Sequence, residues 1–310
     1  MEKQKNKIYD TIIIGTGPAG FSAGIYAARR LMKTLIIGRE FGGQVVWAAD
    51  IENYPGFQSI NNFELIEKLK DHAKAVGAEI INLEITKINK MENGTFSVST
   101  HENEYLSKTI IIATGLSPKK LMISGEERLT GKGVSYCATC DSPLFKNKVV
   151  AVIGGGNSAL DAAELLSNIS EKVYLIYRGS KLKAFETLLN KVISKKNVEI
   201  LLNHKTIEIF GEKKVEKIKV INKLNNEEKE ILLQGIFIEV GRVASSDLAI
   251  GLVKLDSKNQ IIVDEKGQTS QDGIFAAGDI TNIPFKQIII ACGQGAIAAL
   301  SAYEYLQLGE

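Results

Sequence analysis

The sequence predicts an α/β protein with two similar parallel-sheet domains, and the main observation behind this prediction is a repeated local pattern. A short apolar run is followed by a glycine-rich turn and then by a helix-like segment, and this order occurs twice in the 310 residues. Apolar runs of this kind are typical of strands buried on both faces of a parallel sheet. The length is close to that of two domains, and the composition (45% hydrophobic, 24% charged) is that of a globular protein.

The first strand, turn and helix occupy residues 9–14, 15–20 and 21–30, and a second strand follows at 34–37. The turn has the pattern G-x-G-x-x-G, formed by Gly15, Gly17 and Gly20. Such a turn lets the backbone approach a pyrophosphate, while the helix N-terminus supplies unpaired N–H groups and a positive dipole end. Glu40 is a candidate acceptor for the ribose hydroxyls. A tight turn without a ligand and an ordinary surface glutamate are the alternatives.

The second strand, turn and helix occupy residues 149–153, 154–159 and 160–169, with a further strand at 173–176. Gly154, Gly156 and Ala159 form the G-x-G-x-x-A variant, for which a nicotinamide dinucleotide is the natural ligand. The next segment, 177–183, holds three cations and no acid, which favours the 2′-phosphate of NADPH over the free ribose of NADH. A solvated basic turn is the alternative.

The remaining segments complete the two predicted domains. Residues 61–76 have the pattern of a helix, residues 79–112 and 198–240 alternate like strands, and residues 287–306 form a second apolar helix.

Cys137 and Cys140 form a C-x-x-C pair between the two glycine motifs. In such a pair one thiol pKa can fall and a reversible disulfide can form. Half a zinc site or two inert thiols are the alternatives, but the three histidines are scattered, so no metal is expected. Asp141 is a candidate general acid for a departing thiolate, with a plain turn residue as the alternative. Cys292 is interpreted as a packing residue.

Charge and hydropathy exclude several classes of protein. Thirty-eight Lys and Arg against 36 Asp and Glu give a formal charge of +2, which argues against nucleic-acid or membrane-surface binding. The apolar run at 9–15 is too short for a secretory signal, so a cytoplasmic protein is expected. Two dinucleotide motifs and a redox dithiol together predict electron transfer from a pyridine nucleotide through a flavin to a disulfide.

These motifs resemble the low-molecular-weight thioredoxin reductases over nearly the whole chain. The resemblance is carried by the two glycine motifs, by the Cys137–Asp141 segment and by residues 42–44, 52–56, 113–115 and 277–279. It implies two Rossmann-like domains of three-layer ββα architecture, with an FAD domain at 1–116 and 246–310 and an inserted NADPH domain at 117–245. It also implies a homodimer, a thioredoxin or thioredoxin-like partner, Cys140 as the sulfur nearest the flavin, Cys137 as the attacking sulfur and Asp141 as the acid.

The resemblance further implies the residues that contact each cofactor. For FAD these are Gly15, Gly17, Pro18, Ala19, Gly20, Glu40, Gly42, Gly43, Gln44, Asn53, Ile85, Ala113, Gly115, Gly278, Asp279, Lys286, Gln287 and Ile288. For NADPH they are Gly154, Gly156, Asn157, Ser158, Ala159, Arg178 and Lys183.

The sequence departs from the family pattern most clearly at the electron donor. Gly179 stands where the family commonly has a phosphate-binding arginine, so NADH, reduced ferredoxin and reduced flavin remain alternative donors. A peroxiredoxin-reductase flavoprotein is a further alternative, but it would carry an N-terminal thioredoxin-like domain, for which the early position of Gly15 leaves no room. A flavin redox sensor without turnover is the alternative from outside the enzymes. A type-2 ferredoxin–NADP reductase would lack the dithiol.

Overall fold

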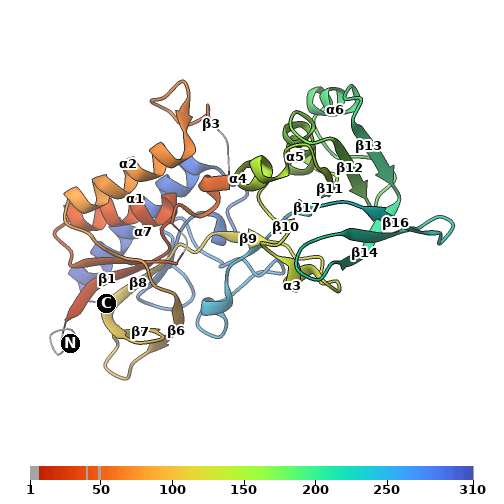
Figure 1. The fold of residues 1–310 in the computed structure, drawn as a ribbon. Helices are drawn as coiled ribbons and strands as arrows, with labels where there is room; N and C mark the ends of the chain where they lie inside the picture. The colour runs from red at the N-terminus through yellow and green to blue at the C-terminus, as the bar shows by residue number, and fades with distance from the viewer. Residues whose placement is uncertain (1–6, 40, 48–49, 310) are drawn as a thin grey trace. The chain divides into compact units, whose positions relative to one another are not determined.

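The computed structural model describes residues 7–39, 41–47 and 50–309. The chain divides into two compact units (Figure 1). Unit 1 comprises Met1–Ser117 and Val243–Glu310, and unit 2 comprises Pro118–Arg242. The chain crosses between the units in two short paired strands, β9 (Leu116–Pro118) and β18 (Arg242–Ala244). The predicted boundaries, after residue 116 and before residue 246, lie one and three residues from these crossings. The cofactor of each unit stays a prediction.

Unit 1 is built on a seven-stranded sheet whose central strands are parallel. The longest strand, β8, has its first residues paired antiparallel to β7 and its last residues paired parallel to β19. The sheet therefore divides at β8, and the hairpin of β6 and β7 extends from the parallel core. The strands are β1 (Ile8–Ile14), β2 (Thr34–Ile37), β5 (Glu79–Ile81), β6 (Ile85–Lys90), β7 (Phe96–Thr100), β8 (Glu104–Ile112) and β19 (Ile274–Ala276).

The side-chain alternation of β1 shows how this sheet separates two layers. Ile13 packs in the cluster that holds the apolar faces of α1 (Pro18–Arg29), α2 (Asn62–Ala75) and α7 (Ile288–Leu308). Ile12 and Ile14 point to the opposite face, where they pack with residues of the β6–β7 hairpin. Figure 1 shows the three helices together on one side of the sheet. The all-apolar runs in the sequence are thus explained by burial on both faces.

Unit 2 repeats the same three layers. Its parallel sheet has the order β10-β17-β11-β12-β13, and Val150 and Val152 of β11 face α5 and α6, while Ala151 and Ile153 face an antiparallel three-stranded sheet. The parallel strands are β10 (Val134–Ser135), β11 (Val149–Ile153), β12 (Lys172–Tyr177), β13 (Val198–Leu202) and β17 (Gly235–Ile238). The other elements are β14 (His204–Phe210), β15 (Lys217–Asn222), β16 (Glu228–Leu232), α5 (Asn157–Ser167) and α6 (Glu186–Ile193).

The predicted α/β fold class with two dinucleotide-binding folds is confirmed by this architecture and by the solved structures described below. The two helices after the glycine motifs begin three residues earlier than predicted, at Pro18 and Asn157. Proline is favoured at the first helical position, where its missing N–H is not needed. The remaining short strands and α-helices are β3 (Asp50–Ile51), β4 (Ile60–Asn61), α3 (Glu126–Leu129) and α4 (Ala138–Asp141), and the 3-10 helices are Gly43–Trp47, Ser142–Phe145, Asp247–Ala249 and Gly278–Ile280.

One helix in the described part of the chain, α7, has the length and apolarity of a membrane span. Its most apolar 18-residue window has a mean hydropathy of 1.2 and is 39% buried, and its residues Ala298, Ala299 and Ala302 belong to the helix-side core of unit 1. A core helix of a globular domain passes the same test.

Candidate active site

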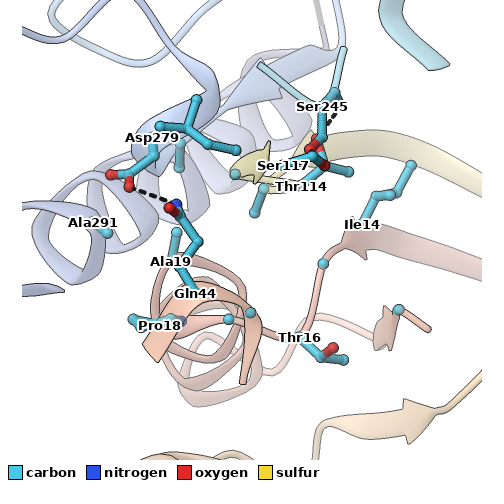
Figure 2. Close-up of a pocket in the computed structure, with 18 of the residues that line it drawn as sticks. Ile14, Thr16, Pro18, Ala19, Gln44, Thr114, Ser117, Ser245, Asp279 and Ala291 are labelled. Atoms are coloured by element: carbon cyan, nitrogen blue, oxygen red, sulfur yellow. Dashed lines mark hydrogen bonds between the residues drawn. The ribbon is translucent and has the colours of Figure 1, made fainter. Parts of the chain in front are cut away.

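The first glycine motif forms one wall of a cavity of about 710 Å³ in unit 1 (Figure 2). Gly15 and Gly20 pack so closely that a Cβ on Gly20 would lie 1.9 Å from the Gly15 carbonyl oxygen. This contact draws the start of α1 against the end of β1. At Gly17 the nearest atom to an added Cβ is 3.9 Å away, so this glycine leaves its face toward the cavity open.

The N-terminus of α1 supplies the electrostatics of this wall. The helix begins at Pro18, and its first turn has no acidic side chain and no side-chain cap. Its first backbone N–H groups therefore keep their partial positive charge at the cavity wall, where Pro18 and Ala19 are lining residues. A phosphate is the ligand that such a helix end is suited to hold.

The cavity lining also carries a half-buried polar cluster, beside the start of α1. Gln44 Nε2 donates to Asp279 Oδ2 at 3.0 Å, and Lys286 Nζ donates to the Thr281 carbonyl oxygen at 2.6 Å. Burial raises the pKa of Asp279, and Lys286 and Gln44 oppose this shift. Burial likewise lowers the pKa of Lys286, against the attraction of Asp279. The cluster thus offers a carboxyl group, an amide and an amine to a ligand with polar ring atoms.

Most of the predicted FAD residues meet at this cavity, although which of them touch a flavin stays a prediction. The lining includes Gly15, Gly17, Pro18, Ala19, Gly43, Gln44, Ile85, Ala113, Gly115, Asp279, Lys286, Gln287 and Ile288. Four others do not line the cavity: Gly20, Gly42, Asn53 and Gly278. Asn53, for example, donates to Gln287 Oε1 at 3.1 Å. Glu40 lies outside the described residues.

Sequence reasoning did not select several residues that the fold brings to the cavity. Thr16 sits inside the glycine motif and could have been chosen on that ground. Ser117 and Ser245 also line the cavity, and their hydroxyl oxygens lie 2.5 Å apart. Thr114 Oγ1 donates to the Ser245 carbonyl oxygen at 2.8 Å. The separation of 128 residues between Ser117 and Ser245 left no local signal for the second serine.

The second glycine motif opens α5 in unit 2, and the chain after β12 is held against it. Lys183 N donates to the Gly155 carbonyl oxygen at 2.7 Å, and Phe185 N donates to Asn157 Oδ1 at 2.8 Å. Ser158 and Ala159 lie in the first turn of α5. The side chains of Arg178 and Lys183 are exposed. This geometry places the basic segment beside the glycine turn.

The Tyr177 ring packs against two glycines at this turn. A Cβ on Gly155 would lie 2.5 Å from the Tyr177 ring, and a Cβ on Gly179 would lie 2.6 Å from the same ring. The ring therefore packs against both glycines. Gly179, which stands where the family commonly has a phosphate-binding arginine, thus leaves room for the Tyr177 ring because it has no side chain.

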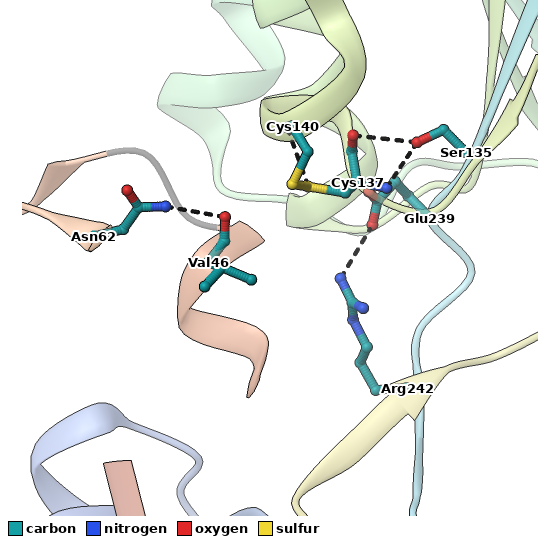
Figure 3. The surroundings of a disulfide bond; sticks show 7 residues. All are labelled: Val46, Asn62, Ser135, Cys137, Cys140, Glu239 and Arg242. Atoms are coloured by element: carbon teal, nitrogen blue, oxygen red, sulfur yellow. Dashed lines mark hydrogen bonds and ion pairs between the residues drawn. A yellow bond between two sulfur atoms is a disulfide. The ribbon is translucent and has the colours of Figure 1, made fainter. Parts of the chain in front are cut away.

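The two cysteines form a disulfide at the start of α4 (Figure 3). Cys137 is the N-cap of this short helix, and its Sγ accepts a hydrogen bond from Cys140 N at 3.1 Å. Ser135 fixes the backbone of Cys137, because Ser135 Oγ accepts from Cys137 N at 3.0 Å and donates to the Cys137 carbonyl oxygen at 3.2 Å. Asp141 ends the helix, and its N–H donates to the Cys137 carbonyl oxygen at 3.2 Å.

Cys292 is buried in α7, as its interpretation as a packing residue requires. Its Sγ donates to the Pro18 carbonyl oxygen at 3.7 Å and lies 3.8 Å from the Tyr54 hydroxyl. Burial raises the pKa of the Cys292 thiol, so it is held as a neutral thiol. Among the described residues no group of three or more His, Cys, Asp and Glu side chains is arranged to hold a metal ion.

Comparison with known proteins decides the family. The model of the pyridine nucleotide-disulphide oxidoreductases matches residues 9–297. The chain belongs to this family. It is 41% identical to one component of the alkyl hydroperoxide reductase of Pseudomonas putida and 39% identical to the thioredoxin reductase of Listeria innocua. It covers 58% of the first relative and 95% of the second, with 96% and 98% of its own length matched.

Solved structures agree with this assignment. The thioredoxin reductase of Lactococcus lactis matches with a TM-score of 0.88 and 37% identity, over 97% of this chain and 99% of that one. That of T. acidophilum matches with a TM-score of 0.85 and 38% identity, over 98% of this chain and 100% of that one. The predicted resemblance to thioredoxin reductases is confirmed.

Proposed function

We propose that this oxidoreductase is a flavin-dependent thioredoxin reductase, which moves two electrons from NADPH through FAD and the Cys137–Cys140 pair to the disulfide of a thioredoxin-like protein. The disulfide supports this proposal most directly. It lies in the same unit as the second glycine motif and immediately before it in the chain. We further propose that the protein acts as a cytoplasmic homodimer.

The cavity of unit 1 fits the predicted FAD. Gly17 leaves open space at a helix N-terminus, as a pyrophosphate requires, and the cluster of Asp279, Gln44 and Lys286 supplies polar partners for a flavin ring. Bound FAD would accept a hydride from a pyridine nucleotide and pass the electron pair to a disulfide. The residues of this cavity bind and orient it.

The dithiol carries out the exchange with the partner. The Cys137 thiolate attacks one sulfur of the partner disulfide, which forms a mixed disulfide and releases the other partner sulfur as a thiolate. Cys140 then attacks Cys137, reforms the Cys137–Cys140 bond and releases the partner dithiol. The N–H of Cys140 that contacts Cys137 Sγ would stabilise the attacking thiolate, and Asp141 is proposed to protonate a departing thiolate.

NADPH is the proposed donor because Arg178, Lys181 and Lys183 follow β12 beside the glycine turn. Their exposed side chains supply positive charge, although Gly179 removes one arginine from the family's usual set.

The reductase component of a peroxide-reducing system is a second candidate function. It is favoured by the 41% identity to the alkyl hydroperoxide reductase component of Pseudomonas putida, of which this chain matches 58%. In that case the partner would be a thioredoxin-like redox module rather than a free thioredoxin.

Two experiments test the proposal. Anaerobic titration of the flavin with NADPH, NADH and reduced ferredoxin should show bleaching by NADPH, and failure of NADPH to bleach it would remove the donor assignment. The variant Cys140→Ser should keep its flavin and lose NADPH-dependent reduction of thioredoxin. Unchanged turnover in Cys140→Ser would refute electron transfer through the dithiol.

A further inference from the structure

Glu239 lies beside the redox dithiol because of the strand register in unit 2. The parallel neighbours β10 and β17 pair Ser135 with Phe237. Cys137 and Glu239 each follow two residues later, so both leave the sheet at the same edge, and neighbouring strands are about 4.8 Å apart. Figure 3 shows Glu239 among the residues that surround the disulfide.

The carboxyl group of Glu239 is enclosed by the protein. Its side chain is 8% exposed, and its Oε2 lies 3.9 Å from Arg242 Nη2. Its backbone is fixed at the glycine turn, where Glu239 N donates to the Ile153 carbonyl oxygen at 2.8 Å and a Cβ on Gly154 would lie 2.2 Å from the Glu239 carbonyl oxygen. The group therefore has little freedom to move away from the edge that holds the cysteines.

Two charged groups act on Glu239 from the elements around it. Arg242, the first residue of β18, favours the carboxylate, whereas Asp161 of α5 opposes it. Burial is the largest effect, and the three together raise the pKa of Glu239 to about 7. A carboxyl with such a pKa exchanges its proton in the pH range in which C-x-x-C thiols also ionise.

We propose that Glu239 takes up one of the two protons that accompany reduction of the Cys137–Cys140 disulfide, an inference that rests on the proposed redox function of this pair. Two electrons from a hydride donor or a dithiol reductant break the S–S bond. One proton goes to a cysteine and one to the Glu239 carboxylate, while the other sulfur stays a thiolate. Reoxidation by a partner disulfide returns both protons to solvent or to the leaving thiolates.

The physical reason is the charge that reduction creates. A new thiolate beside an ionised carboxylate is a like-charge pair, so the two groups titrate as one coupled system and the carboxylate gains affinity for a proton. Asp141 lies on the other side of the pair in the chain, next to Cys140, and is the acid expected from the family. Glu239 is a second acid, contributed by the segment that follows β17.

The test measures the redox potential of the cysteine pair against pH. Full-length protein is equilibrated with dithiothreitol or glutathione redox buffers from about pH 6 to 9, quenched, and scored by mass-shift alkylation of its thiols. The variants are Glu239→Gln, Asp161→Asn and, as a matched control, Glu212→Gln, which removes an exposed carboxyl from the same unit. Cys292 is a free thiol outside the redox pair, so it adds the same mass shift in every sample and serves as an internal standard for complete labelling.

The expected result is a difference in slope. Where Glu239 is ionised beside the disulfide and protonated beside the thiolate of the reduced pair, reduction takes up one more proton in the wild type than in Glu239→Gln. In that pH range the reduction equilibrium of the wild type should change an additional tenfold per pH unit, which is about 30 mV for a two-electron couple. Asp161→Asn should move this region to lower pH, because it removes a charge that raises the Glu239 pKa. Glu212→Gln should match the wild type.

Equal slopes in the wild type and Glu239→Gln would overturn the inference, even if their potentials differ by a constant offset. If Glu239→Gln does not fold, the Asp161→Asn curve decides, and an unmoved curve overturns the inference. Because the reductant is a chemical dithiol, the result is independent of turnover. Failure to reduce thioredoxin would refute the proposed function and leave a measured difference in slope standing.

Discussion

The contact between Gly20 and Gly15 gives a prediction that separates packing from ligand binding. In Gly20→Ala the new Cβ would lie 1.9 Å from the Gly15 carbonyl oxygen, whereas real Cβ contacts stay beyond 3.0 Å. The start of α1 must therefore retreat from the end of β1 by about 1 Å, against a close-packed interior. Overpacking of this kind costs about 1–3 kcal/mol, and the gain in helix propensity from Gly to Ala, about 1 kcal/mol, offsets only part of it.

Gly17→Ala is the matched comparison. Its Cβ would meet its first neighbour at 3.9 Å, and its backbone at φ −93° is open to any residue. The reduced freedom of the unfolded chain stabilises by about 0.4–1 kcal/mol, and because Gly17 is the N-cap of α1, where alanine is disfavoured, this gain is offset and the apoprotein should keep its stability to within about 1 kcal/mol. The added methyl group points toward the cavity, and we expect it to weaken FAD binding at least tenfold.

Urea unfolding of the apoproteins and fluorescence titration with FAD measure the two effects separately. Gly20→Ala should lose both stability and affinity, and Gly17→Ala should lose affinity alone. Wild-type FAD affinity in Gly17→Ala, or an apoprotein of Gly20→Ala as stable as the wild type, would refute the reasoning.

Three further predictions concern unit 2. Glu126 is 2% exposed and accepts three hydrogen bonds of 2.7–2.8 Å, one of them from the Tyr136 hydroxyl, so Glu126→Gln should lower the unfolding free energy by about 1–3 kcal/mol in urea titrations. The unfolding free energy of the wild type should fall relative to that of Glu239→Gln as pH rises from 4.5 to about 7. The Glu239 pKa is higher in the folded state, so the native protein binds the Glu239 proton more tightly than the unfolded chain does, and this stabilisation is lost as the proton leaves. Urea titrations of both proteins at about pH 5 and about pH 8 measure the change. The double variant Tyr177→His/Gly179→Arg should bind NADPH about tenfold more tightly in calorimetry, whereas Gly179→Arg alone should gain less, since the Tyr177 ring blocks its Cβ.

The local parts of the fold could be predicted from the sequence because each depends on neighbouring residues. The two glycine turns, the strands before them and the C-x-x-C pair are all read within about 30 residues, which is the span of one strand–helix–strand unit. The helix starts differed by three residues, at Pro18 and Asn157, since the glycine pattern extends into the first turn.

The parts that could not be predicted depend on register between distant segments. Glu239 and Cys137 are 102 positions apart, and they come together only because β10 and β17 are neighbours with Ser135 opposite Phe237. Ser245 reaches the cavity of unit 1 for the same kind of reason. It follows β18, and its partner Ser117 lies in β9, the strand that pairs with β18. No periodicity or motif in a single sequence encodes which strands become neighbours.

Each glycine turn packs against the end of the following strand, but the side chain that fills this contact comes from the turn in unit 1 and from the strand in unit 2. This difference affects which electron donor unit 2 can select. In unit 1 this side chain is Thr16, which belongs to the turn, and a Cβ on Gly38, just after β2, would lie 2.7 Å from Thr16 Oγ1. In unit 2 the side chain lies at the end of the strand, where the Tyr177 ring covers Gly155 of the turn. The space between turn and strand end is where a dinucleotide places its ribose. An aromatic ring there offers stacking area but no charge, so selection of a 2′-phosphate in unit 2 depends on the exposed cations that follow the ring.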